Sequence, residues 1–79
     1  MDYLEERLIT LITEQLSIEK TYVIPTANFE TDLGADNLDI IGIVMATEKE
    51  FDITLDGDQA EKVKTVNDLL VLVRKASPK

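Results

Sequence analysis

Acidic and amide side chains crowd one stretch of the chain that contains the types of residue able to do acid–base chemistry: Asp32-Leu33-Gly34-Ala35-Asp36-Asn37-Leu38-Asp39. Paired carboxylates such as Asp36 and Asp39 can act as general acid and base. However, no electrophile-binding motif accompanies them, and a chain of 79 residues is too short to enclose much substrate. Because Asp and Asn are also preferred caps at helix starts, Asp36 or Asn37 is better interpreted as a cap. We therefore do not expect an enzyme.

A second acidic stretch, Asp52-Ile53-Thr54-Leu55-Asp56-Gly57, mimics the opening of a calcium-binding loop, with glycine at the sixth position. The twelfth position must supply a bidentate glutamate, but here it is Val63. The chain also has no cysteine and no histidine, so thiolate and imidazole ligands for zinc are absent. We therefore expect no metal site.

The elements that position these residues follow from the apolar pattern. Apolar residues recur at three- and four-residue steps near the start of the chain, which predicts a helix over residues 3–16 with one buried face. Asp2 is expected to cap that helix. The residues of the predicted buried face are Leu4, Leu8, Leu11, Ile12 and Leu16.

Residues 17–36 show no regular period and are interrupted by Pro25 and Gly34. A long structureless loop is unusual inside a compact domain. Scattered apolar side chains indicate instead an ordered crossover that packs across the bundle. These side chains are Ile18, Val23, Ile24, Phe29 and Leu33.

Residues 37–51 carry the most regular helical pattern, through Leu38, Ile41, Val44, Met45 and Phe51. Ile40 and Ile43 widen the apolar surface beyond a single stripe. Burial in a small bundle is one explanation for this width. The alternative is a helix that packs inward on one side and meets a partner on the other.

The C-terminal part predicts one short helical turn around Gln59–Lys62 and a final helix from Thr65, where Thr65 and Asp68 have capping-box spacing. Pro78 is expected to stop that helix. Its predicted buried side consists of Val66, Leu69, Leu70 and Val73. The fold class is therefore all-α, a small up-and-down four-helix bundle of three main helices and one short helix, in a single domain over residues 1–79.

Charge is segregated along the chain, whose net charge is −8. Residues 28–61 contain ten acidic residues and one lysine, whereas residues 62–79 contain one acidic residue and five basic ones. Such acidity argues against nucleic-acid binding, because phosphates would be repelled. A solvated acidic surface and a face that steers basic partners both explain the segregation.

The chain has no apolar run near the roughly 20 residues that span a bilayer. Its N-terminus lacks the basic start and apolar block of a signal peptide. We therefore expect a cytoplasmic protein without a membrane span, and a monomer.

Several segments spread along the chain follow one family's pattern, in addition to the first helix and the long crossover: Leu33-Gly34-Ala35-Asp36, Leu38-Asp39, Val44-Met45-Ala46, Glu48, Glu50-Phe51, Ala60-Glu61-Lys62 and Thr65-Val66. In these segments nearly the whole chain resembles acyl carrier proteins. The resemblance implies a carrier that tethers acyl intermediates through 4′-phosphopantetheine and delivers them in fatty-acid, or related lipid or polyketide, biosynthesis.

The resemblance also implies partners, namely the acyl chain itself, the phosphopantetheinyl transferase and basic-patch enzymes of acyl-chain synthesis. The helix at residues 37–51 corresponds to the recognition helix of the family. The implied partner-binding residues are Asp36, Leu38, Asp39, Ile41, Met45 and Glu48. Gly42 and Lys49 stand where the family usually has acidic residues, which weakens or redirects the expected docking.

Asn37 occupies the attachment position, where the family has the serine that bears the arm. A phosphodiester needs a side-chain hydroxyl, and the asparagine amide is a poor nucleophile that cannot form this ester. The chain is therefore expected to be a carrier that cannot be loaded, whether by deliberate replacement of the serine or as a natural divergent member. The alternative is an arm-free, carrier-like interaction module that regulates a partner enzyme through its acidic second helix.

Overall fold

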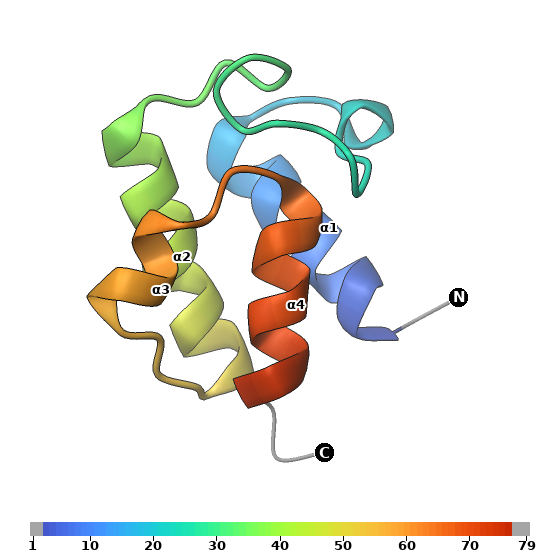
Figure 1. Cartoon of the computed structure of the whole chain (residues 1–79). Helices are drawn as coiled ribbons and strands as arrows, with labels where there is room; N and C mark the ends of the chain where they lie inside the picture. The colour runs from blue at the N-terminus through green and yellow to red at the C-terminus, as the bar shows by residue number, and fades with distance from the viewer. Residues whose placement is uncertain (1–2, 77–79) are drawn as a thin grey trace.

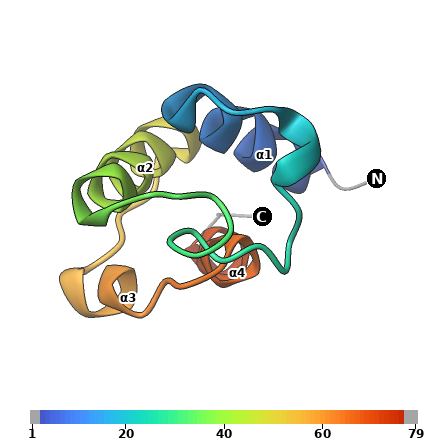
Figure 2. The same cartoon turned by 90° about the horizontal axis from the view of Figure 1, so that it is seen from above.

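The computed structural model describes residues 3–76, which form a small bundle of helices. In chain order the elements are α1 (Tyr3–Leu16), the 3-10 turn η1 (Lys20–Tyr22), α2 (Asn37–Phe51), α3 (Gly57–Glu61) and α4 (Val66–Ala76). Seen from above, α1 and α2 form one side of the bundle and α3 and α4 the other, while the crossover between α1 and α2 lies over one end (Figures 1 and 2). The predicted all-α fold of three main helices and one short helix is confirmed.

Helix α1 has the predicted bounds and the predicted inward face. Leu8, Leu11 and Ile12 are buried, and Leu4 and Leu16 pack half-buried against the same core. The proposed cap, Asp2, lies outside the described residues. Burial of this apolar stripe is the main force that holds a helix of this length in place, since isolated short helices are marginal in water.

The crossover at residues 17–36 is ordered by its apolar side chains, as the sequence predicts. Val23 and Phe29 are buried, whereas Ile18 and Leu33 are half-buried against the core. The prediction for Ile24 is wrong, because its side chain is 50% exposed. The preceding residue, Val23, which ends the turn η1, takes the inward position instead and is 2% exposed.

Backbone hydrogen bonds tie this crossover to the start of α4, which is distant in sequence. The amide of Phe29 donates to the carbonyl of Lys64 at 2.9 Å, and the amide of Val66 donates to the carbonyl of Ala27 at 3.0 Å. A third bond runs from the amide of Asn67 to the carbonyl of Pro25 at 2.9 Å. The crossover is therefore a fixed strap, and the segment that leads into α2 starts from a defined position.

The C-terminal elements agree with the predicted pattern but not with all of its bounds. The short helix begins earlier than the predicted turn at Gln59–Lys62, because Asp56 caps it and the Asp56 side chain accepts from the amide of Gln59 at 2.8 Å. The predicted capping box at Thr65 and Asp68 is present, with bonds of 3.1 and 3.2 Å, and α4 itself starts one residue later. Pro78 lies outside the described residues. The predicted inward residues of α4 are all buried: Val66, Leu69, Leu70 and Val73.

Candidate functional site

The start of α2 presents residue 37 on a rigid support. Gly34 has a φ of 71°, a left-handed conformation that favours glycine, and it turns the strap toward the helix. The next residue, Ala35, is buried, and its amide donates to the carbonyl of Phe29 at 2.8 Å. Asn37 is then the first residue of α2, and its side chain is exposed.

Asp36 and Asp39 form a reciprocal capping box at this helix start. The carboxylate of Asp36 accepts from the amide of Asp39 at 2.8 Å, and the carboxylate of Asp39 accepts from the amide of Asp36 at 3.1 Å. Of the two residues considered as the cap, Asp36 has that role and Asn37 does not. Because each carboxylate has a second, unused oxygen at an exposed position, both aspartates can still present charge to a partner.

The outer face of α2 is apolar and exposed. Leu38, Ile41 and Met45 are 76%, 46% and 63% exposed, whereas Ile43 and Val44 on the inner face are buried. Spacings of three, four and seven residues place Leu38, Ile41 and Met45 on one side of the helix. Both explanations for the wide apolar pattern thus apply, since α2 packs inward and also presents a separate stripe. We call Leu38, Ile41 and Met45 the outer stripe.

Glu48, the last of the predicted partner contacts, follows Ile41 by seven residues on the same side of α2, but its carboxylate is engaged within the chain. Its side chain is half-buried, and its Oε2 accepts from the amide of Leu55 at 2.8 Å. The structure thus places Asp36, Leu38 and Asp39 next to residue 37, continues the exposed side of α2 through Ile41 to Met45, and directs the Glu48 carboxylate toward the chain after α2. Sequence spacing could not show this, because the acceptor and the donor are seven residues apart across the end of a helix.

An apolar groove of about 330 Å³ lies between α2 and α3, and Asn37 stands at its edge. Ile40, Ile41, Val44 and Met45 line it from α2, and Gly57, Ala60 and Glu61 line it from α3. Its size is at the lower end of the range for small-molecule sites. The sequence does not predict this groove, because its α3 wall depends on where the short helix packs.

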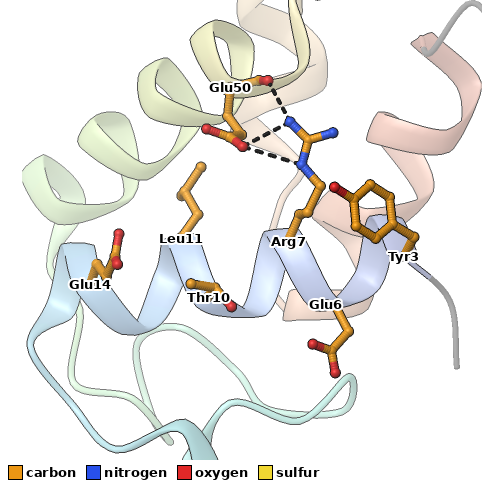
Figure 3. A pocket seen from close by; sticks show the side chains of 7 residues that line it. All are labelled: Tyr3, Glu6, Arg7, Thr10, Leu11, Glu14 and Glu50. Carbon is orange, nitrogen blue, oxygen red and sulfur yellow. Dashed lines mark hydrogen bonds and ion pairs between the residues drawn. The ribbon is translucent and has the colours of Figure 1, made fainter.

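A polar hollow of about 270 Å³ lies on the opposite flank of α2, against α1. There Arg7 reaches from α1 to α2 and donates to a carboxylate oxygen of Glu50 at 2.8 Å and to its backbone carbonyl at 3.0 Å (Figure 3). The guanidinium also lies 5.5 Å from the ring centroid of Tyr3 and 4.7 Å from that of Phe51. We call Tyr3, Arg7, Glu50 and Phe51 the arginine lock.

The stretch considered as a calcium loop has other roles here. Asp52 ends α2 in a left-handed conformation with φ of 55°, and Asp56 caps α3. Within residues 3–76, no group of three or more acidic side chains is arranged to hold a metal ion. In the same residues no helix is both long enough and apolar enough to cross a membrane.

Comparison with protein families shows which family has this sequence pattern. The family model described as a phosphopantetheine attachment site matches residues 6–73, from the first helix to the last. Members of this family use 4′-phosphopantetheine as their cofactor and are typically carriers and not catalysts. The helical bundle, the exposed position at the start of α2 and this match together show that the chain belongs to the phosphopantetheine attachment family, as an acyl-carrier-protein-like carrier.

Proposed function

We propose that this chain has the docking surface of an acyl carrier protein of fatty-acid, or related lipid or polyketide, synthesis, but that it cannot take up the arm because Asn37 occupies the attachment position. The observation that carries the proposal is the outer stripe, which lies beside residue 37 at the start of α2. Three large apolar side chains exposed together on one helix face are typical of a surface that meets another protein. Their position beside the attachment residue suits partners that act there.

The residues at the attachment position do not fit a covalently bound phosphopantetheine. Asn37 is exposed and therefore reachable, but its side chain ends in an amide. An amide nitrogen has a delocalised lone pair, and the ester bond of the arm requires an oxygen nucleophile. We therefore propose that the arm-free form is the one in which this chain meets its partners.

The groove between α2 and α3 is an argument that a variant with a serine at position 37 would carry an acyl chain. It is lined mainly by apolar side chains and opens beside residue 37, so an alkyl chain that starts there could enter it without crossing the acidic surface. The volume of about 330 Å³ has room for a short chain. We propose no catalytic role for Asp36 and Asp39, because each carboxylate accepts a hydrogen bond from the backbone amide of the other residue.

The acidic residues around α2 support basic partners, including the phosphopantetheinyl transferase. Residues 28–61 contain ten acidic side chains and one basic one, which gives long-range attraction to a basic patch. Gly42 and Lys49, by resemblance, reduce this attraction, so we expect binding weaker than that of a fully acidic helix. The proposed contact residues are Asp36, Leu38, Asp39, Ile41 and Met45.

The second candidate function is an arm-free interaction module that regulates a partner enzyme through the same helix. Asn37 favours it, because a natural member with this residue would keep the fold and the outer stripe without the arm. Both candidates predict docking through α2. They differ in whether a serine at position 37 restores a substrate for the transferase.

The docking surface can be tested with a broad-specificity phosphopantetheinyl transferase as the partner, in a titration at low and at high salt. We expect Leu38→Ala and Met45→Ala each to weaken binding about tenfold, and added salt to weaken it further. Val71→Ala is the matched control, since Val71 is 40% exposed on α4, outside the outer stripe. Equal losses from all three variants, or no binding even at low salt, would contradict the proposed surface.

A further inference from the structure

Glu48 collects the backbone amides that follow the end of α2. Its carbonyl accepts from the amide of Asp52 and, at 3.0 Å, from the amide of Ile53. Its carboxylate accepts from the amide of Leu55 at 2.8 Å. One residue thus binds the turn between α2 and α3 at three amides.

The turn held in this way leads directly into α3. Ile53 and Leu55 are both buried, so the turn is fixed to the core at the same points. The residue after Leu55 is Asp56, the cap of α3, whose side chain accepts from the amide of Gln59. The Leu55 amide bonded to Glu48 is thus next to the residue that caps α3.

Helix α3 forms one wall of the apolar groove but is poorly able to hold itself in place. It has only the five residues 57–61, and among them none is buried. A helix this short has little intrinsic stability, so its position depends on the half-buried contact of Ala60 with the core and on the chain at its ends. At its N-terminal end, the Glu48 carboxylate is the side chain of α2 that bonds the incoming chain.

We propose that Glu48 is a positioning residue that holds the α3 wall against α2 and so sets the width of the apolar groove. This differs from the docking role that the resemblance implies for Glu48, because it depends on a hydrogen-bond acceptor and not on a negative charge. The proposed role in the fold stands on contacts within the chain. Only its consequence for an acyl chain rests on the proposed function.

Two substitutions separate the acceptor from the charge. Glu48→Gln keeps an oxygen that can accept from the Leu55 amide but removes the charge. Glu48→Ala removes both and leaves a partly buried amide without its partner. Glu61→Gln is the matched control, since Glu61 is an exposed glutamate that lines the same groove from α3.

The experiment is amide hydrogen exchange measured by NMR on the unmodified chain and its variants, together with the methyl shifts of groove residues. We expect Glu48→Ala to speed exchange at Leu55 and Ala60 about tenfold or more relative to amides of α1, and to shift the methyl signals of Ile41 and Ala60. Glu48→Gln and Glu61→Gln should each stay within about threefold of the parent at these amides.

Three results would overturn the proposal. These are unchanged exchange at Leu55 and Ala60 in Glu48→Ala, equal effects of Glu48→Gln and Glu48→Ala, and a uniform rise that includes the α1 amides. The last result would show that Glu48 supports the whole bundle and not one wall. Because no arm, transferase or acyl chain is used, failure here is distinct from failure of the proposed carrier function.

Discussion

The two flanks of α2 are built in opposite ways. Toward α1, α2 packs against the apolar core that both helices share, and the arginine lock also holds it. In the lock, one guanidinium contacts a carboxylate, a carbonyl and two rings. Toward α3, α2 borders an open apolar groove whose far wall is a five-residue helix. The difference shows how a very small bundle can keep α2 fixed on one flank and still leave space beside it on the other.

The two ends of α2 are restrained by different groups. The arginine lock acts near the C-terminal end of α2, at Glu50 and Phe51. Residue 37 and the outer stripe lie toward the other end, where the strap and the capping box fix the helix start. Both ends of α2 are thus restrained by groups that leave the outer stripe exposed.

The largest effect is expected from replacing the inner isoleucine of α2 with alanine, and the same replacement of the outer isoleucine is the comparison. Ile43 is 1% exposed and Ile41 is 46% exposed. Ile43→Ala should lower the free energy of unfolding by about 3 kcal/mol, because it leaves a cavity in the core. Ile41→Ala should lower it by less than about 1 kcal/mol, since that side chain is already half in water. Urea unfolding measures both, and equal losses would show that α2 does not have two distinct faces.

Removal of the arginine lock should have an intermediate effect. Arg7→Ala is expected to lower the free energy of unfolding by about 1–2 kcal/mol, because it removes three charge-assisted bonds to Glu50 and the contacts with two rings. Solvent weakens the ion pair itself, since the two side chains are 33% and 45% exposed.

Arg7→Lys is the matched control for the lock. It keeps the charge but cannot donate in a fork, so it should recover less than half of the loss. Full recovery by lysine would mean that charge alone holds this flank. Thermal unfolding at matched salt concentration distinguishes the two outcomes.

A smaller, stabilising effect is expected at Gly42 in the middle of α2. A Cβ atom added there would meet the Gln15 side-chain oxygen at 3.8 Å, an ordinary contact. Since glycine costs about 1 kcal/mol of helix propensity relative to alanine, Gly42→Ala should raise the free energy of unfolding by about 0.5–1 kcal/mol. A loss of stability in urea unfolding would show that α1 and α2 need a glycine where they meet.

The elements of the fold were largely predictable because their causes are local. Apolar spacing gave the bounds of α1 and α2, and the residue types at Thr65 and Asp68 gave the capping box. The short helix starts two residues before the predicted turn, because Asp56 caps it and its first residues, Gly57 and Asp58, carry no apolar signal. Ile24 was placed in the core because an irregular segment has no period that separates inward from outward positions.

The site was predictable in part, for a physical reason that particular residues show. Leu38, Ile41 and Met45 share a helix face by spacing alone, so their common surface follows from the sequence. Arg7 and Glu50 are 43 residues apart, and neither carries a local signal of the other. The bond of Glu48 to Leu55 depends likewise on how the chain turns after α2, which no periodicity describes.

The central claim is that this scaffold is a competent carrier silenced at one position. Its most direct test is the intact mass of the chain and of Asn37→Ser after incubation with coenzyme A and a phosphopantetheinyl transferase. We predict that only the serine variant gains the mass of the arm, with its stability within about 0.5 kcal/mol of the parent because Asn37 is exposed and Asp36 provides the cap. Gain of the arm by the chain as given would contradict the claim. If neither protein gains mass, the arm-free interaction module replaces the carrier.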